Sequence, residues 1–253
     1  MINPMSLQGK IILVTGASAG IGKATAIQLS KLGAKLILVA RNRERLEETL
    51  NSLEGKDHAY YSFDLSHIES IDGFAKNVTE NHGPLNGLVH SAGIGNARTL
   101  AMLKNINLKE VMTINFYSFI ELVRCFSKKK SFCDGGSIVA VSSISSIKGY
   151  KSKTAYNASK AALDSSIRCI AGELANKRIR INSVMPGWVA TEMLERYSEE
   201  TAGIQEGEDT VSKQMLGLVE PIEVANLIAF LLSDATKTIT GTSVLIDGGL
   251  LQN

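Results

Sequence analysis

The sequence has few cysteines and no excess of charge. Only three of its 253 residues are cysteines, Cys125, Cys133 and Cys169, and none of them belongs to a C-x-x-C pair. An odd, scattered set of cysteines is typical of a reducing compartment rather than of a disulfide framework. The formal net charge is +2, so the composition gives no support to nucleic acid as a partner.

Long apolar runs are also missing. No run approaches the ~18 residues that a membrane-spanning helix needs. The first ten residues, MINPMSLQGK, lack the basic region, apolar segment and cleavage site of a secretory signal. We therefore expect a cytoplasmic protein without a membrane partner, and we predict no metal site.

The sequence does contain a regular alternation of short apolar runs and longer helical patterns. Hydrophobic residues make up 44% of the chain, which is enough for a sizeable core. Strands are predicted at Ile11–Val14, Lys35–Ala40, Ala59–Phe63, Gly87–His90, Ser137–Val141, Arg180–Val184 and Val244–Ile246. Helices are predicted at Ile21–Leu32, Glu44–Leu53, His67–Asn81, Leu108–Lys128, Thr154–Asn176 and Pro221–Leu232.

This order predicts an α/β fold, a Rossmann-type doubly wound parallel sheet of seven strands with helices on both faces. Several strand runs are continuously apolar, as in strands that are buried on both faces. We expect one domain over residues 1–253. Residues 190–217 are polar and only weakly periodic, and we expect them to form a mobile flap over the substrate.

The loop TGASAGIG, Thr15–Gly22, permits three interpretations. GASAG fits the nucleophile elbow of hydrolases, with Ser18 as nucleophile. That reading needs an acid and then a histidine base further along the chain, but all four histidines lie at or before His90 and none lies in the last 163 residues. A glycine-rich turn without a ligand stays open. The third reading is a dinucleotide cradle, in which Gly16, Gly20 and Gly22 let a helix N-terminus approach a pyrophosphate.

The end of the second predicted strand, LILVARNRER, bears on the choice of cofactor. NAD-binding units place a carboxylate there for the ribose hydroxyl, but the first acid here is Glu44, inside the next helix. Arg41 and Asn42 stand at the strand end instead. Because a guanidinium binds phosphate, we predict NADP(H) in preference to NAD(H). The alternative is that Arg41 and Arg43 merely flank a helix start.

Candidate catalytic residues come later in the chain. Tyr156 and Lys160 are four residues apart in YNASK and share one helix face. A phenol titrates near pH ~10, and a nearby ammonium would lower that pKa and make proton transfer with a carbonyl or alcohol possible. Ser143 ends a predicted strand and could orient a substrate oxygen. Asn115 lies in an apolar helical stretch and needs a specific partner. Each has an alternative interpretation, in which Tyr156 and Lys160 are two solvent-exposed residues of a helix, Ser143 is part of an ordinary turn, and Asn115 is a core asparagine whose hydrogen bonds are satisfied.

Taken together, these motifs resemble those of the short-chain dehydrogenase/reductase family, with the general look of its 3-oxoacyl-acyl-carrier-protein reductases. The resemblance runs nearly end to end. It also includes Asp64–Leu65, HSAG at His90–Gly93, NSVMPGWVAT at Asn182–Thr191 and TGTSVLIDGG at Thr240–Gly249. It implies a homotetramer or homodimer that acts on a small carbonyl or alcohol substrate, such as a 3-oxoacyl thioester, a ketone or a sugar. The other class of function, a dinucleotide-sensing or scaffold protein without turnover, remains as the alternative.

The resemblance also implies roles for individual residues. Tyr156 would be the acid–base, Lys160 would lower its pKa and bind the nicotinamide ribose, and Ser143 would orient the substrate. Asn115 would hold a water linked to Lys160. The implied cofactor-binding residues are Gly16, Ser18, Gly20, Ile21, Gly22, Arg41, Asn42, Asp64, Leu65, Ser91, Ala92, Gly93, Tyr156, Lys160, Pro186, Gly187, Val189 and Thr191. The implied substrate residues are Ser143, Tyr150, Tyr156, Trp188 and Met193.

The sequence departs from the family pattern at two places. The usual Asn-Asn-Ala-Gly is His90-Ser91-Ala92-Gly93 here, and Ala19 stands where many NADP-preferring members carry a basic residue. The first asparagine normally ties neighbouring strands together. We expect His90 to be structural rather than catalytic, because the proton relay is complete without it.

Overall fold

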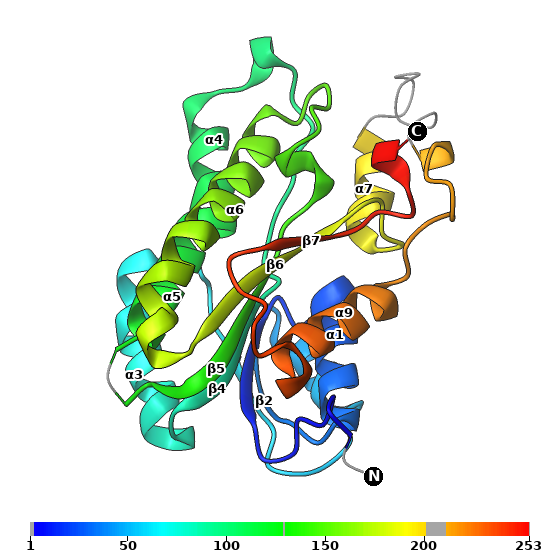
Figure 1. The fold of residues 1–253 in the computed structure, drawn as a ribbon. Helices are drawn as coiled ribbons and strands as arrows, with labels where there is room; N and C mark the ends of the chain where they lie inside the picture. Colours follow the sequence, from blue (N-terminus) through cyan, green and yellow to red (C-terminus); the bar gives the residue numbers. More distant parts are fainter. Residues whose placement is uncertain (1–2, 129, 201–210, 253) are drawn as a thin grey trace.

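One parallel sheet organises the computed structural model, which describes residues 3–128, 130–200 and 211–252 (Figure 1). Its seven strands lie in the order β3-β2-β1-β4-β5-β6-β7. They are β1 (Ile11–Thr15), β2 (Lys35–Ala40), β3 (Ala59–Ser62), β4 (Leu85–His90), β5 (Phe132–Val141), β6 (Arg180–Pro186) and β7 (Ser243–Ile246). The direction of strand addition reverses between β1 and β4. In doubly wound folds, ligands bind at the carboxyl edge near such a reversal.

Helices cover both faces of this sheet, with α3, α5 and α6 on one side and α1 and α9 on the other (Figure 1). The α-helices are α1 (Gly20–Lys31), α2 (Arg43–Asn51), α3 (Ile71–His82), α4 (Asn105–Met112), α5 (Ser118–Phe126), α6 (Thr154–Leu174), α7 (Glu192–Glu200) and α9 (Pro221–Leu232). The shorter helices are η1 (Ile68–Ser70), η2 (Leu100–Met102), η3 (Thr113–Tyr117), η4 (Ile144–Ser146), η5 (Ala175–Lys177), η6 (Asp234–Thr236) and η7 (Leu250–Gln252), of which η3 is π-helical.

The alternation of side chains along each strand produces two cores. Leu13 faces the core shared with α3, α5 and α6, while its neighbours Ile12 and Val14 face the core shared with α1 and α9. Successive strand residues point to opposite faces, so a strand covered on both sides must be apolar at every position. That requirement explains the continuous apolar runs of the sequence.

The predicted doubly wound parallel sheet is confirmed, and β2 and α9 have the predicted bounds. Helix α9 starts where its sequence dictates. Pro221 stands in the first helical turn, and Glu220 and Glu223 form a reciprocal capping box. Proline at the start of a helix loses no hydrogen bond, and the capping box satisfies backbone N–H groups that would otherwise be unpaired.

One of the predicted helices is interrupted in the structure. The single helix expected at Leu108–Lys128 is α4, then the π-helical turn η3, then α5. Part of the segment expected to be a flap is helix α7, whose Leu194 and Tyr197 pack against the apolar cluster around Trp188, and the flap itself stays a prediction. Residues 201–210 of that flap lie outside the described residues. None of the helices in the described ranges combines the length and hydropathy that crossing a membrane requires.

Candidate active site

The glycine loop between β1 and α1 is built by close backbone contacts. Gly16 has a left-handed φ of +67°, and a Cβ there would lie 2.8 Å from the backbone nitrogen of Ala92. A Cβ on Gly22 would lie 2.1 Å from the carbonyl oxygen of Gly16. Side chains at either position would push α1 away from the sheet, so both glycines hold the helix N-terminus against the strand ends.

The start of α1 has the features of a phosphate-binding helix N-terminus. Helix α1 begins at Gly20, and the preceding Ala19 makes no side-chain capping bond. The first N–H groups of the helix therefore have no side-chain acceptor at the N-cap and remain available to an anion. Ser18 has no hydrogen bond with a histidine in the described part of the chain, so the arrangement does not support Ser18 as a hydrolase nucleophile.

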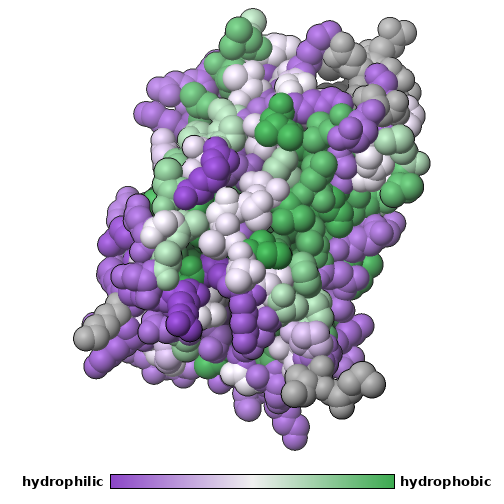
Figure 2. Space-filling view, in the orientation of Figure 1, coloured by the Kyte–Doolittle hydropathy of each residue, from purple (hydrophilic) through white to green (hydrophobic). Residues whose placement is uncertain are grey.

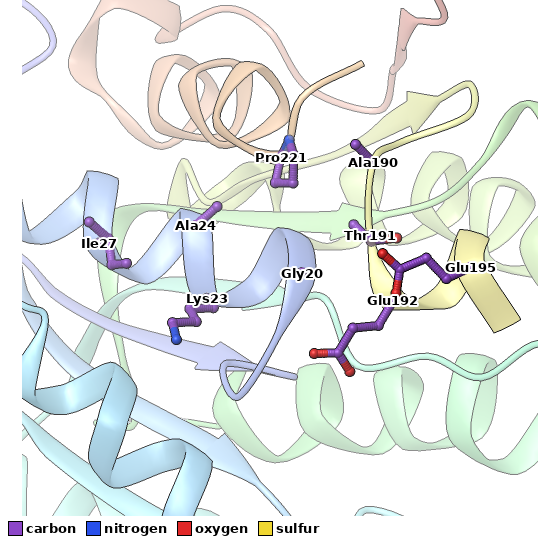
Figure 3. A pocket seen from close by; sticks show the side chains of 9 residues that line it. All are labelled: Gly20, Lys23, Ala24, Ile27, Ala190, Thr191, Glu192, Glu195 and Pro221. Atoms are coloured by element: carbon purple, nitrogen blue, oxygen red, sulfur yellow. The ribbon is translucent and has the colours of Figure 1, made fainter. Parts of the chain in front are cut away.

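A cavity of about 410 Å³ lies beside this turn. Figure 3 shows Gly20 and Thr191, two predicted cofactor residues from distant parts of the sequence, at its wall together with Lys23 and Glu192. A Cβ on Gly20 would lie 3.3 Å from Cγ2 of Thr191. The fold thus brings the segment after β6 onto the glycine loop. The predicted catalytic residues do not line this cavity.

The end of β2 presents one arginine without an ion pair. Arg43 is paired with Glu47 at 2.9 Å and Arg45 with Glu192 at 2.8 Å. Arg41 is exposed and forms no salt bridge within the described ranges. Asn42 caps α2, because its side-chain oxygen accepts the backbone N–H of Arg45 at 2.9 Å. Arg41 is therefore the group at this strand end that is available to a further anion.

Asp64 follows β3 by two residues and lies within electrostatic range of Arg41. Burial raises the pKa of Asp64, but hydrogen bonds from Ser66 and the charges of Arg41 and His67 outweigh burial and leave the pKa below its usual value. Its Oδ1 accepts the backbone N–H of Ser66 at 2.9 Å. The carboxylate is therefore ionised and held in place beside the Arg41 guanidinium.

The other predicted cofactor residues also follow strand ends. They are Leu65 after β3, Ser91, Ala92 and Gly93 after β4, and Pro186, Gly187, Val189 and Thr191 in the segment that begins at the end of β6; Ile21 lies in the first turn of α1. The side chains of Leu65 and Val189 are buried in the two cores. Packing explains the glycine at position 187, since a Cβ there would lie 2.4 Å from Oε1 of Gln214.

Tyr156 and Lys160 lie one turn apart near the start of α6. The Lys160 ammonium is buried, donates to the carbonyl oxygen of Val141 at 2.7 Å, and lies 5.6 Å from the centroid of the Tyr156 ring. Ser143, at the end of β5, forms a hydrogen bond with the Tyr156 hydroxyl. The three groups are thus together at the carboxyl edge, as the sequence predicts.

The pKa values of Lys160 and Tyr156 differ from what the sequence predicts. Burial lowers the pKa of Lys160 to about 8, and the Asp164 carboxylate partly opposes that effect. Burial raises the pKa of Tyr156 to about 12, opposed by the hydrogen bond with Ser143. The expectation that Lys160 gives Tyr156 a lowered pKa is therefore wrong for the chain by itself, because desolvation of the phenolate is the larger effect.

Asn115 lies in the π-helical turn η3, and its side chain is fully buried. Its amide donates to the carbonyl oxygen of Ile94 at 2.9 Å and to the Ser159 hydroxyl at 3.0 Å, and its Oδ1 accepts the Ile94 N–H at 2.8 Å. Ser159 in turn donates to the carbonyl oxygen of Tyr156 at 2.7 Å. Asn115 therefore fixes the loop after β4 to α6. Both of its amide hydrogens are already used, and its contact with a water stays a prediction.

The loop fixed by Asn115 runs directly over Tyr156 and Lys160. A Cβ on Gly93 would lie 3.6 Å from Nζ of Lys160, and a Cβ on Gly95 would lie 3.6 Å from Cδ2 of Tyr156. The same loop contacts the glycine loop at Gly16 through Ala92. It therefore connects the predicted phosphate site with the predicted proton-transfer site.

His90 is buried and neutral. Its Nδ1 lies 3.2 Å from the Thr15 hydroxyl, and that hydroxyl also accepts the backbone N–H groups of Ser91 and Ala92. The hydroxyl hydrogen is thus left for Nδ1, which assigns the proton of the imidazole to Nε2. Burial and the charge of Lys160 lower the pKa of His90 to about 3. The histidine ties β1 to β4, the structural role expected from the sequence.

The predicted substrate residues lie in different surroundings. Tyr150 and Trp188 pack edge to face, with centroids 5.8 Å apart, in an apolar cluster that also includes Tyr197. Met193 is 39% exposed and takes no part in that cluster. The side chain of Gln214 forms two hydrogen bonds with the backbone of Trp188. It accepts from the backbone N–H at 2.8 Å and donates to the carbonyl oxygen at 3.0 Å.

Sequence reasoning missed several residues that shape this site. Asp164 is buried beside Lys160 and accepts from the Ser142 hydroxyl at 2.8 Å and from the Ser183 hydroxyl at 2.6 Å. Its position one turn after Lys160 was a usable signal, because a carboxylate on an apolar helix face needs partners. Lys153 is also absent from the predicted set, and nothing local in the sequence distinguishes it from a solvated lysine.

Comparison with known proteins agrees with this arrangement. Residues 16–251 match a family model described as enoyl-(acyl carrier protein) reductase. A 3-oxoacyl-[acyl-carrier-protein] reductase FabG from Thermotoga maritima is 33% identical over 98% of this chain and 100% of its own. A dehydrogenase/reductase from Sinorhizobium meliloti 1021 has a TM-score of 0.88 at 32% identity, covering 98% of this chain and 97% of its own. A protein from Agrobacterium tumefaciens with bound NADP has a TM-score of 0.85 at 25% identity, covering 100% of both chains.

Proposed function

Because this chain belongs to the short-chain dehydrogenase/reductase family, whose enzymes use nicotinamide cofactors, we propose that it is an NADP(H)-dependent oxidoreductase. Its substrate is a carbonyl/secondary alcohol pair, such as a 3-oxoacyl thioester, a ketone or a sugar. The observation that carries the proposal is the grouping of Tyr156, Lys160 and Ser143 beside the loop that reaches the glycine turn. We also propose a cytoplasmic location, in keeping with its three free cysteines.

In the reductive direction, the Ser143 and Tyr156 hydroxyls donate hydrogen bonds to the substrate carbonyl oxygen. The nicotinamide, when bound, supplies the hydride. With a pKa of about 12, the Tyr156 phenol is protonated at neutral pH and can give its proton to that oxygen. The buried Lys160 ammonium, 5.6 Å from the ring centroid, stabilises the phenolate that remains. Oxidation of an alcohol runs through the same groups in reverse.

Two features of the chain support a bound nicotinamide dinucleotide, and the first of them favours NADP(H) over NAD(H). Arg41 has no ion pair in the described ranges and lies beside Asp64, where a ribose 2′-phosphate would give its guanidinium a partner. The uncapped start of α1 offers N–H groups to the pyrophosphate. The Agrobacterium protein with bound NADP shares this fold. Arg41 would hold the 2′-phosphate without help from Ala19, which has no charge.

We further propose a homotetramer or homodimer. Strand β7 ends the sheet, and an uncovered edge strand readily pairs with another chain. Figure 2 shows apolar residues gathered on the face that carries β7 and α9, and Leu245, Ile222 and Phe230 of these elements are exposed. An apolar surface beside a free edge suits contact with a second copy.

The test is NADPH oxidation measured with ketones, acyl thioesters and keto sugars, with Tyr156→Phe as the variant. Loss of the acid–base group should lower turnover by about 100- to 10,000-fold and change NADPH affinity by less than about threefold. Tyr117→Phe is the control, since Tyr117 is 48% exposed and outside the site. Undiminished turnover by Tyr156→Phe would refute the role of the phenol. Binding of NADPH without turnover of any compound would favour the sensing or scaffold alternative.

A further inference from the structure

A lysine sits among aromatic rings next to the proposed proton-transfer site. Nζ of Lys153 lies 3.7 Å from the ring centroid of Tyr197, 4.2 Å from that of Trp188 and 5.5 Å from that of Tyr150. Trp188 and Tyr197 are stacked, with centroids 5.2 Å apart. We call Tyr150, Trp188 and Tyr197 the aromatic cage. Aromatic faces attract the ammonium, but they bring no negative charge to balance it.

No acidic residue in the described part of the chain balances this charge either. Lys153 has no salt bridge there, and burial alone lowers its pKa to about 8. Lys160 differs, because the Asp164 carboxylate acts on it. A desolvated ammonium without a counter-ion is stabilised when an anion binds beside it.

Two further donors at the cage have no acceptor among the residues that the structure describes. Trp188 is 8% exposed, and its Nε1 is buried without a hydrogen-bond partner. The Tyr150 hydroxyl is also buried and unpartnered. Buried donors are nearly always paired in folded proteins, so unpaired ones indicate an acceptor that arrives from outside. The cage thus collects three donor groups, those of Lys153, Trp188 and Tyr150, and calls for an acceptor.

The cage is close to the reacting end of the substrate. Nζ of Lys153 lies 6.0 Å from the ring centroid of Tyr156, and Lys153 immediately precedes the first residue of α6. A small molecule whose carbonyl oxygen meets Tyr156 and Ser143 can therefore place a second polar group at the cage. A lysine side chain has four flexible carbons, so its ammonium can turn toward that group.

We propose that Lys153, Trp188 and Tyr150 bind a carboxylate of the substrate, and that the substrate is a small oxo acid or the corresponding hydroxy acid. This inference rests on the proposed function and narrows its substrate class. A single ammonium matches the single charge of a carboxylate. A phosphate dianion would leave excess negative charge near Asp247, whose carboxylate already acts on Tyr150 and is nearly buried. A neutral thioester would leave Lys153 unbalanced.

Trp188 is the only tryptophan in the sequence, so its fluorescence reports on binding at the cage. Its emission is followed while 2-oxobutanoate, 3-oxobutanoate or 4-oxopentanoate is added, with and without saturating NADP⁺. An oxo acid and NADP⁺ are both oxidised and cannot react. Each acid is compared with its methyl ester, which keeps the same acyl chain, adds one methyl group and has no charge. At least one acid should bind 10-fold or more tightly than its ester.

Variants then locate the carboxylate. Lys153→Met keeps an unbranched apolar side chain and removes the charge, so it should weaken binding of the preferred acid by about 10- to 100-fold. Binding of the ester should change by less than about threefold. Tyr150→Phe keeps the ring and should weaken acid binding severalfold. Lys148→Met, which removes the same charge from the same segment, is the control and should leave both affinities unchanged.

The outcomes separate this inference from the proposed function. If no acid is preferred over its ester, or if Lys153→Met weakens acid and ester equally, the cage is a packing cluster and the inference is wrong. If Lys153→Met does not fold, the acid and ester affinities of the unmodified protein and of Tyr150→Phe still decide. Turnover of neutral ketones without a preference for acids overturns the inference and leaves the proposed function standing. Selective acid binding that depends on Lys153, without turnover, supports the site and refutes the reaction.

Discussion

Replacement of Gly22 by alanine tests the packing on which the proposed cofactor site depends. A Cβ at this position would lie 2.1 Å from the carbonyl oxygen of Gly16, and real Cβ atoms essentially never approach within 3.0 Å of another heavy atom. The first turn of α1 and the backbone of Gly16 in the glycine loop must therefore separate by about 0.9 Å, the difference between these two distances. The atom in the way belongs to the backbone, so no side-chain rotation relieves the contact. Overpacking of this kind costs about 1–3 kcal/mol or more.

A matched control lies in the same chain. Gly73 is inside α3, and a Cβ there would have no heavy atom within 4 Å. Alanine at an open helical position is more favourable than glycine by about 0.5–1 kcal/mol. Gly22→Ala should therefore lower the free energy of unfolding and Gly73→Ala should raise it, with a difference of about 3 kcal/mol between the variants. In a protein of this size that corresponds to about 6–12 °C in Tm.

Urea unfolding followed by circular dichroism measures this difference, and a fluorescence titration measures NADPH affinity. Because Gly22→Ala displaces the start of α1, it should also weaken NADPH binding by about 10-fold or more. Gly73→Ala should leave that affinity unchanged. Equal unfolding midpoints for the two variants would refute the close contact between α1 and the glycine loop. Loss of stability with full NADPH affinity would refute the link from that contact to the cofactor.

Two further predictions concern the strand ends. Arg41→Asp should weaken NADPH at least 10-fold more than NADH, because only NADPH carries the 2′-phosphate; equal losses would contradict the assignment of Arg41. Burial lowers the pKa of His90 to about 3 from 6.5, so between these pH values the unfolded state binds more protons and stability falls as pH falls. Between pH 6.5 and pH 4.5, the free energy of unfolding in urea should fall by about 2–3 kcal/mol more for the unmodified protein than for His90→Asn. The control is His67→Asn, at an exposed position, which should lose as much as the unmodified protein. Identical pH profiles for the two variants would refute a neutral buried His90.

Much of the fold was predictable because the signals are local. The apolar run at Lys35–Ala40 is β2, and the proline and glutamates at the start of α9 mark its first turn. Turn chemistry and periodicity act over a few residues, so they are readable without the structure. Helix α7 was missed for the opposite reason. Its sequence is mostly charged, and among its described side chains Leu194 and Tyr197 reach the cluster around Trp188.

The Tyr156–Lys160 pair proposed to transfer the proton was predictable in position but not in charge. Spacing alone places Tyr156 and Lys160 on one face of a helix. Their pKa values depend on how deeply α6 is buried and on which groups face it, and here desolvation dominates for both residues. The partners Val141 and Asp164 follow from the packing of α6 against β5 and β6. A spacing rule carries no information about either.

Lys153 shows the same limit more sharply. Its neighbours in sequence are those of an ordinary solvated lysine. The aromatic cage comes from the loop before α6, the segment after β6, and α7. The cage exists only once the sheet has brought these three segments together, so no local pattern reveals it.

Asn115 is the residue where the local pattern is actively misleading. The sequence around it reads as a continuous helix from Leu108, and a regular helix is the correct inference from a period of 3.6 residues. The structure instead widens one turn into the π-helical η3, a form that is rare and frequent at functional sites. In η3 the Asn115 amide holds Ile94 and Ser159 together. The irregular turn thus fixes the loop that lies against Lys160 and Tyr156. The helix departs from the period of 3.6 residues at the turn that positions this loop, so the wrong prediction falls on a residue of the proposed site.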